Sequence, residues 1–288
     1  MIRKAVIPAA GFGTRFLPAT KSQPKEMLPI VDTPVIQYVV EEAASAGITD
    51  ILMVIGKGKR SIEEHFDRSF QLEAQLLEKG KTAELEAMRR ISGLADIHFV
   101  WQKEMRGLGD AVYCARHHVK DEAFVVLLGD TLIDSAAPAA GQLAQLYERF
   151  EQPAVLVEQV EPSRVSLYGV IDGELIERGV FRVQDFVEKP NQEAAPSNLA
   201  IAGRYVLTPD IFDYLGRVTP SPGGEVQLTD ALRMMVKDRP MYALLLEGRR
   251  CDIGSKEGFI KTNIEFALKR DDMAEDLRRY IQELAKRI

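Results

Sequence analysis

Short apolar runs alternate with amphipathic stretches throughout the first half of the chain. Runs typical of buried strands span 4–9, 51–55, 97–101 and 124–128. Between them, apolar residues spaced three and four positions apart predict helices over 35–46 and 109–119, and a charged helical insertion over 69–90 on the flank of the sheet. Strands that alternate with helices indicate a parallel sheet joined by crossover helices.

The second half has a different pattern. A helix over 139–150 and a strand over 154–159 continue the alternation, but 168–207 has short β segments with turns at Asp172-Gly173 and Arg178-Gly179. Further elements are predicted over 226–236, 241–247, 255–269 and 272–286. We therefore expect a Rossmann-like α/β fold in which helices sandwich a mixed sheet, with an added small β layer and a helical C-terminus.

Several residues are placed to cap the predicted helices. Ser61 and Glu64 have the spacing of a capping box, and Ser255 is placed to cap the helix that follows it. The chain contains no linker-like low-complexity stretch and no internal repeat. We therefore expect one domain over 1–288, in which the helices of 255–288 could form an oligomerisation arm.

Composition narrows the function. The 288 residues are 46% hydrophobic and 28% charged, with a formal net charge of −6, which argues against nucleic-acid binding because a phosphate backbone requires a basic excess. The sequence shows neither a membrane-span-length apolar run nor a signal-peptide core, so a cytoplasmic location without membrane contact is expected. The two cysteines lie far apart and the four histidines lack metal-ligand spacing.

A glycine-containing loop follows the first strand. Gly11 and Gly13 would let a phosphate approach the backbone, and Arg15, Lys21 and Lys25 could donate to it. The dinucleotide fingerprint is excluded because Phe16 stands where its third glycine belongs, and the phosphate-binding P-loop motif is also absent. Two glycines after a strand also fit a plain tight turn.

Polar residues follow other predicted strands. In open α/β sheets, ligands bind beyond the carboxyl ends of the strands. Gln102 lies at one such end, where its amide could pair with the imide edge of uracil or thymine. Asp130, which follows an apolar run, and Asp252, which precedes a predicted helix, could share Mg²⁺ with substrate phosphates. A solvated glutamine and turn or capping aspartates are the alternatives.

A second polar group closes the predicted strand over 181–187. Glu188 could accept hydrogen bonds from sugar hydroxyls while Lys189 meets a phosphate, although a plain surface ion pair is an equal alternative. The run 225–230 is interpreted as a helix start that packs beneath this group, with a structural rather than a catalytic role.

The segments 11–21 and 24–29 together resemble the signature of the sugar-nucleotide pyrophosphorylases, a family of nucleotidyltransferases. Glu188-Lys189-Pro190, Tyr168-Gly169 and the run 225–230 resemble further motifs of that family, and the likeness extends over most of the chain. The resemblance implies transfer of a uridylyl group from UTP to α-D-glucose 1-phosphate, with Mg²⁺ as cofactor. Family members are usually dimers or tetramers, so a homo-oligomer is expected.

The resemblance also implies a role for each matching residue. The catalytic cations would be Arg15, Lys25 and Lys189, and the metal ligands would be Asp130 and Asp252. Gly169 and Glu188 would contact the sugar. The nucleotide would be bound by Ala9, Ala10, Gly11, Gly13, Thr14, Glu26, Gln102 and Gly107.

Three questions stay open at this point. The base could be thymine, because Gln102 does not reach a methyl group on the far side of the ring, and the enzyme would then be a thymidylyltransferase. The chain could also be a nucleotide-sugar-binding regulator without activity. Finally, the apolar stripe of the last helix could mediate oligomerisation or pack on its own domain. That stripe consists of Met273, Leu277, Tyr280, Ile281, Leu284 and Ile288.

Overall fold

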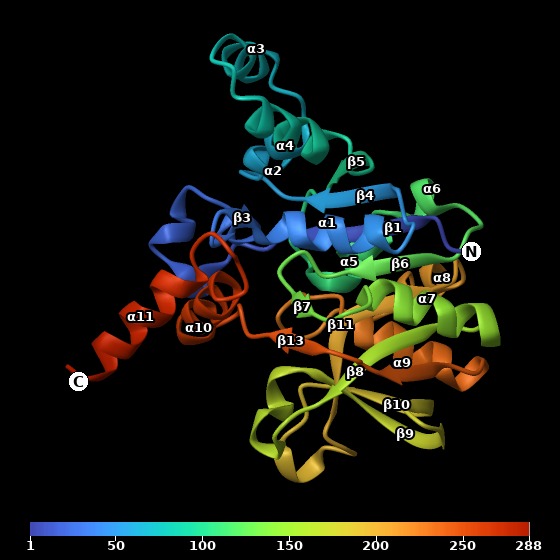
Figure 1. Cartoon of the computed structure of the whole chain (residues 1–288). Coiled ribbons are helices and arrows are strands. Elements are labelled where there is room, and N and C mark those ends of the chain that lie inside the picture. Colours follow the sequence, from blue (N-terminus) through green and yellow to red (C-terminus); the bar gives the residue numbers. More distant parts are fainter. Residues whose placement is uncertain (288) are drawn as a thin grey trace.

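Four parallel strands form one half of a nine-stranded sheet in the computed structural model, which describes residues 1–287 (Figure 1). Their order across the sheet is β5-β4-β1-β6. The bounds are β1 Lys4–Ala9, β4 Asp50–Ile55, β5 Asp96–Trp101 and β6 Phe124–Leu127. The predicted strands are confirmed to within one residue at each end. Their carboxyl ends all lie at one edge, as the parallel register requires.

The other half of the sheet is mostly antiparallel. It continues in the order β11-β8-β12-β10-β9, and β11 pairs antiparallel with both β6 and β8. The bounds are β8 Ala154–Gln159, β9 Gly169–Glu177, β10 Val180–Glu188, β11 Leu199–Leu207 and β12 Tyr242–Leu245. The predicted antiparallel addition is therefore continuous with the main sheet.

One predicted turn in this addition is wrong. Asp172-Gly173 lies inside β9, where Gly173 pairs with Val183 of β10. Arg178-Gly179 does form the turn between the two strands, and Gly179 has the positive φ of 76° that favours glycine there. Asp-Gly is a turn signal that cross-strand pairing overrides when both flanking strands are long enough to stay in register.

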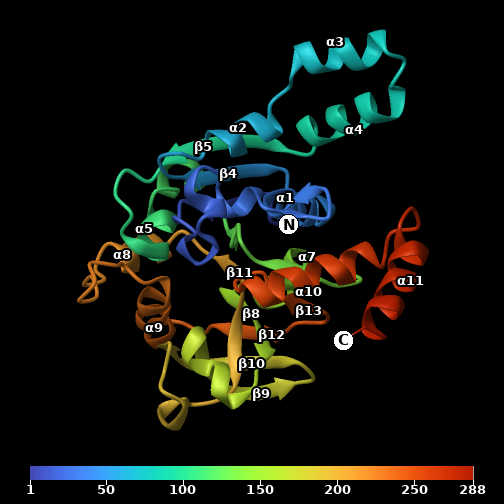
Figure 2. The same ribbon diagram turned by 90° about the vertical axis from the view of Figure 1, so that its left-hand side faces the viewer.

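Helices cover both faces of the sheet (Figure 2). Ile7 of β1 packs in one hydrophobic cluster with α1 and α7, whereas Val6 packs in the other with α5, α8 and α9. This alternation follows from the two-residue period of a strand. The bounds are α1 Val35–Ser45, α5 Gly107–Tyr113, α6 Arg116–Val119, α7 Ala139–Phe150, α8 Ile211–Leu215 and α9 Leu228–Asp238.

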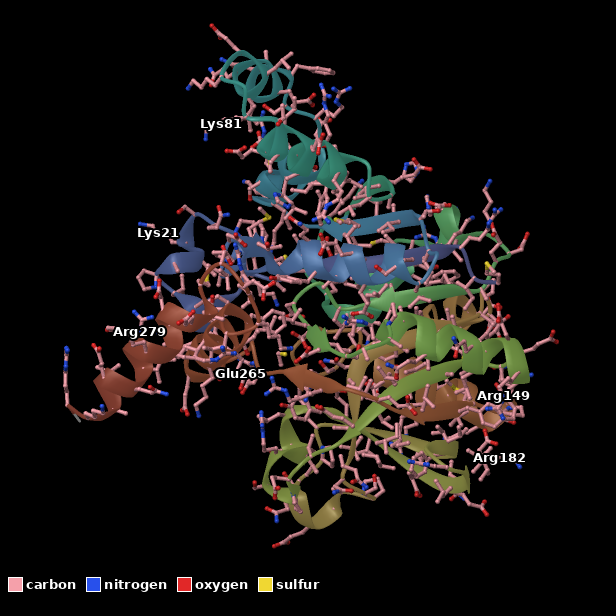
Figure 3. The ribbon with its side chains drawn as sticks, viewed as in Figure 1. Lys21, Lys81, Arg149, Arg182, Glu265 and Arg279 are labelled. Carbon is pink, nitrogen blue, oxygen red and sulfur yellow. The ribbon has the colours of Figure 1, made fainter. Side chains whose placement is uncertain are left out.

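The charged insertion is a helix pair that projects from the body, and Lys81, labelled in Figure 3, lies in the turn between its two helices. It consists of α3, Phe70–Glu78, and α4, Thr82–Ser92. The expectation that it packs along the sheet is wrong for most of its length. Leu85 is buried, but Leu72 and Leu77 are 42% and 62% exposed. Glu73 ties the pair together by accepting hydrogen bonds from Arg68 and Arg89.

The predicted capping box is also wrong. The helix α2, Arg60–Phe66, begins after Lys59 and has no side-chain cap. Ser61 lies inside the first turn, where its Oγ is buried without a hydrogen-bond partner. The sequence spacing fits, but the helix starts two residues too early for Ser61 to serve as its N-cap.

Two short ribbons and two helices complete the structure. The ribbons pair β2, Pro29–Ile30, with β3, Thr33–Pro34, and β7, Leu132–Asp134, with β13, Arg249–Cys251. Ser255 caps α10, Lys256–Ala267, as predicted. The last helix, α11, spans Ala274–Ala285 and extends away from the sheet in both ribbon views. Ile288 lies outside the described residues. Among those residues, none of the helices has the length and apolarity needed to cross a membrane.

Candidate active site

The loop after β1 is packed tightly against Lys25. Gly13 has a φ of +67°, and a Cβ placed on it would lie 2.9 Å from the Cβ of Lys25. A Cβ on Gly11 would lie 3.4 Å from the Lys25 Nζ atom. Thr20 donates a hydrogen bond of 2.8 Å to the Gly13 carbonyl and closes the loop. The glycines therefore bring the backbone close to a lysine ammonium, as a phosphate-binding loop requires.

A buried ion pair supports this loop from below. The side chains of Glu26 and Lys59 are 1% and 5% exposed, and their charged groups lie 2.6 Å apart. Lys59 also donates a 2.7 Å hydrogen bond to the Gly11 carbonyl. Burial raises the pKa of the Glu26 carboxyl and lowers the pKa of the Lys59 ammonium, while each charge opposes the shift of the other. Glu26 therefore supports the loop instead of facing the nucleotide, contrary to the expectation from sequence.

Asp130 lies beside the same loop. The Gly129 N–H donates to the Pro8 carbonyl at 3.2 Å, which brings the end of β6 against the end of β1. The Lys25 Nζ atom lies 2.5 Å from Asp130 Oδ2. Although partial desolvation in the cavity wall would by itself raise the pKa of the Asp130 carboxyl, the Lys25 ammonium reverses this and holds the pKa below its usual range. Asp130 is thus a carboxylate at neutral pH.

Asp252 lies at the site, but it does not follow a strand of the main sheet as the sequence suggested. It follows β13, which belongs to the separate ribbon with β7 and not to the main sheet. Cys251 pairs with Leu132 in this ribbon, so Asp252 is placed beside the residues that follow Asp130. The Asp252 carboxylate accepts a hydrogen bond from Arg164 at 3.3 Å.

A cavity of about 710 Å³ brings these groups together. Asp130 and Asp252 both line it, and each side chain keeps 43% of its surface exposed. Arg15 lies on the same wall, where a Cβ on Gly254 would be 3.6 Å from Arg15 Nη1. The other cations and aromatic groups of the wall are Arg164, Tyr168 and Arg250.

A second cavity, of about 270 Å³, adjoins the first and shares Arg15 and Asp130 with it. Gly13, Thr14 and Lys25 line this smaller cavity, so the loop after β1, the predicted phosphate loop, opens into it. Lys21 belongs to neither wall and points away from the body of the protein (Figure 3). Of the three cations predicted for this loop, Arg15 and Lys25 therefore lie at the site and Lys21 does not.

The residues present are compatible with a magnesium ion. Within residues 1–287 there is no cluster of three or more His, Cys, Asp or Glu side chains that could enclose a metal ion. Two open carboxylates on one cavity wall are nevertheless the donor set that Mg²⁺ uses when substrate phosphates and water complete its coordination. Both carboxylates are paired with cations, Lys25 and Arg164, which shows that the cavity favours positive charge at these two points.

Gln102 is held at the carboxyl end of β5 by its own side chain. The residue is 5% exposed, and its Nε2 donates to the Gly107 carbonyl at 3.1 Å and to Asp110 Oδ2 at 2.8 Å. Both amide hydrogens are therefore used inside the protein. The predicted pairing of a donor and an acceptor with the base is wrong in this respect, because only the oxygen is left to meet a ligand.

Gly107 is needed for its backbone. Its φ is +90°, and a Cβ there would lie 2.9 Å from the Val226 carbonyl oxygen. Ala9 and Ala10 are also buried, so only their backbone groups could contact a nucleotide. Gln102 lies at the same sheet edge, since its N–H donates to the Ile55 carbonyl at the end of β4.

The predicted sugar-binding residues form a separate cluster on β9 and β10. Gly169 and Glu188 are direct partners across these strands. Thr229 donates a 2.6 Å hydrogen bond to Glu188 Oε2, so the start of α9 packs against this carboxylate as expected. A Cβ on Gly169 would lie 3.2 Å from the same oxygen.

Lys189 connects this cluster to the large cavity. Its side chain is more than half exposed, and its Nζ lies 3.3 Å from Glu188 Oε1. Its N–H donates to the carbonyl of Tyr168, which lines the cavity. Lys189 has a φ of +44°, an unusual backbone conformation for a residue other than glycine and one that is concentrated at functional sites.

Comparison with known proteins agrees with this geometry. The family described as "Nucleotidyl transferase" matches residues 4–268. UTP–glucose-1-phosphate uridylyltransferase YngB from Bacillus subtilis (strain 168) is 53% identical over 286 residues, which cover 99% of this chain and 96% of that protein.

Two solved structures of UDP-glucose pyrophosphorylase are also similar, each 46% identical and covering 94% of this chain and 100% of theirs. The apo form has a TM-score of 0.89, and the complex with UDP-glucose has a TM-score of 0.85. The chain therefore belongs to the nucleotidyl transferase family, among the UTP–glucose-1-phosphate uridylyltransferases.

Proposed function

We propose that this protein makes UDP-glucose and pyrophosphate from UTP and α-D-glucose 1-phosphate. The observation that carries the proposal is the cavity that Arg15, Asp130 and Asp252 line together with Tyr168, the residue before Gly169. The names of the relative from Bacillus subtilis and of the UDP-glucose complex support the choice of substrates.

The reaction needs no protein nucleophile. A phosphate oxygen of glucose 1-phosphate attacks the α-phosphorus of UTP, and the bond from that phosphorus to the oxygen bridging it to the β-phosphate breaks. The electron pair leaves with pyrophosphate. Positioning and charge neutralisation then account for most of the catalysis. Arg15 would neutralise the leaving pyrophosphate, Lys25 the α-phosphate, and Lys189 would hold the attacking phosphate.

Asp130 and Asp252 would hold the magnesium ion. When bound, this ion would draw negative charge from the phosphates and relieve the repulsion between the two carboxylates. Lys25 and Arg164, which contact those carboxylates in the structure, would then be available to phosphate oxygens. In this way two cations of the chain exchange a carboxylate partner for a substrate partner.

The direct test is turnover by the purified protein. With Mg²⁺, UTP and glucose 1-phosphate, we expect pyrophosphate and UDP-glucose in equal amounts, and none when either substrate is omitted. UTP and dTTP are compared in the same assay, because faster turnover of dTTP would make the protein a thymidylyltransferase. Binding of UDP-glucose without any turnover would identify a silent regulator and overturn the proposal.

We also propose that the protein is a homo-oligomer. Apolar side chains lie exposed on both C-terminal helices, including Ile260 and Ile264 of α10 and Tyr280 and Leu284 of α11. The helix α11 extends away from the sheet, as a contact with a second copy would require (Figure 1). Light scattering at micromolar concentration should give at least twice the mass of the chain, whereas the mass of a monomer would contradict the proposal.

A further inference from the structure

The side-chain amide of Gln102 is fixed in one of its two orientations. A carboxylate and a carbonyl can only accept hydrogen bonds. The Asp110 carboxylate and the Gly107 carbonyl both contact one end of the amide, at 2.8 and 3.1 Å, so that end must be the NH₂ group. The opposite end, Oε1, is therefore an acceptor whose identity follows from its neighbours.

Asp110 is itself held in place. Arg106 Nη2 donates a 2.8 Å hydrogen bond to Asp110 Oδ1, which leaves Oδ2 for Gln102. The backbone around this pair is pinned as well, because the Val226 N–H donates to the Arg106 carbonyl and the Gly109 N–H donates to the Val226 carbonyl. Asp110 is thus a rigid acceptor in the first turn of α5.

The oxygen of Gln102 remains open to a ligand. Oε1 accepts no hydrogen bond within residues 1–287. Ser61 Oγ is the one fully buried and unpartnered side-chain polar atom in that part of the chain, so Oε1 keeps contact with solvent. It lies at the sheet edge that also carries the phosphate loop, because Gln102 directly follows β5.

We propose that Asp110 is a positioning residue that sets base selectivity by presenting Gln102 Oε1 to the nucleotide. An acceptor at this point pairs with the N3–H donor of uracil and opposes the N3 acceptor of cytosine. This inference rests on the proposed function, in which a uridine nucleotide is the substrate. The role requires an acceptor-only side chain at position 110, because a neutral amide there could donate and allow the Gln102 amide to turn over.

The experiment compares binding of UTP and CTP by calorimetry without metal, so that it does not depend on catalysis. We expect Asp110→Asn to reduce the preference for UTP over CTP by about tenfold or more, mainly through weaker UTP binding. Asp185→Asn is the matched control, since Asp185, like Asp110, is hydrogen-bonded to an arginine, here Arg233, but lies on β10. This control should leave the preference unchanged.

A double mutant separates a positioning role from a structural one. In a Gln102→Ala background, Asp110→Asn should cause no further loss of base preference, because Asp110 acts through Gln102. If Asp110→Asn lowers the preference equally in both backgrounds, or leaves it intact in a folded protein, the inference is wrong. Asp110→Ala replaces Asp110→Asn if the latter does not fold.

A binding measurement on the wild-type protein tests the inference independently of the variants. A uridine triphosphate methylated at N3 has no donor for Oε1 and should bind at least about tenfold more weakly than UTP. Equal binding of the two would overturn the inference whatever the variants do. If the wild-type protein binds UTP no better than CTP, the proposed function fails as well, whereas a UTP preference that Asp110→Asn does not alter refutes the positioning role alone.

Discussion

The two halves of the candidate site are built differently. The predicted nucleotide half lies at the carboxyl ends of parallel strands. Two of its polar pairs are buried, Glu26 with Lys59 and Gln102 with Asp110, whereas Arg15 of its loop is exposed. The sugar half lies on antiparallel strands, and its charged groups are largely open to solvent, as the half-exposed side chains of Lys189 and Arg164 show. Buried ionic groups are costly to leave unpaired, whereas exposed ones contribute little to stability.

This difference has a mechanistic meaning. A buried, hydrogen-bonded half is already arranged before its ligand arrives, so little ordering is needed on binding. In the open half, the flexible lysine and arginine side chains become ordered only when the ligand binds. We therefore expect substitutions in the nucleotide half to affect folding and binding together, and substitutions in the sugar half to affect activity with little change in stability.

The largest effect is expected where a buried charge loses its partner. Lys59→Met leaves the Glu26 carboxylate unpaired beneath the phosphate loop and should lower the free energy of unfolding by about 3–5 kcal/mol. The change is measured by urea denaturation. Lys57→Met is the control, because Lys57 is an exposed lysine of the same turn and should change stability by less than about 0.5 kcal/mol. Equal losses in the two variants would contradict the role of the pair.

A smaller effect is expected from crowding the sugar half. A Cβ at Gly169 would lie 3.2 Å from Glu188 Oε2 and from Thr229 Oγ1, so Gly169→Ala should displace the carboxylate. We predict that KM for glucose 1-phosphate rises about tenfold while KM for UTP is unchanged. Gly173→Ala is the control, since it is similarly crowded by Phe181 on the same strands, away from Glu188. A matching rise in that variant would show that the effect is a general distortion of the strands.

The open ion pair of the cavity should matter for activity and not for stability. Arg164→Gln removes a half-exposed pair with Asp252, so its cost in unfolding free energy should be within about 1 kcal/mol. Arg149→Gln breaks an equally exposed pair with Glu177 at the far side of the protein and should cost about the same. Only the Arg164 variant should lower kcat/KM. Unchanged kinetics in that variant would remove Arg164 from the site.

The smallest effect on activity is expected in the projecting helix pair. Hydrogen bonds from Arg68 and Arg89 lower the pKa of Glu73 from 4.5 to about 2. A lowered folded-state pKa gives stability that is complete above about pH 4.5 and is lost as the pH falls toward 2. Glu73→Gln at neutral pH should therefore speed hydrogen exchange in 70–92 and leave turnover unchanged. Unaltered exchange would show that Glu73 does not hold α3 to α4.

The sequence was sufficient for the parts that depend on local pattern. The strand β1, the helix α7 and the cap at Ser255 were predicted because hydrophobic period and capping chemistry are read within a few residues. Gly13 and Lys25 were also predicted locally, because glycines and cations within one short loop after a strand indicate phosphate binding. The assignment of Gly169 and Glu188 to the sugar came from the family resemblance, and their cross-strand pairing is seen only in the structure.

Other features depend on partners far away in the chain. Lys59 was missed because a lysine in a glycine turn reads as solvated, and only its partner 33 residues earlier explains its burial. Asp252 follows β13, which pairs with β7 in a separate ribbon. A strand of three residues is too short to show the two-residue hydrophobic period of a strand in the sequence. The orientation of Gln102 required knowing that Asp110 faces it. Such placements arise from tertiary packing, which local patterns do not encode.

The central claim is that one metal ion, held by Asp130 and Asp252, joins the two halves. The most direct measurement is Mn²⁺ binding in the presence of UTP, together with turnover, for Asp130→Asn, Asp252→Asn and the double mutant. Each single change should abolish most Mn²⁺ binding and lower kcat on the order of a thousandfold, and the double mutant should be barely worse. Fully additive losses, or full activity in EDTA, would contradict a shared ion.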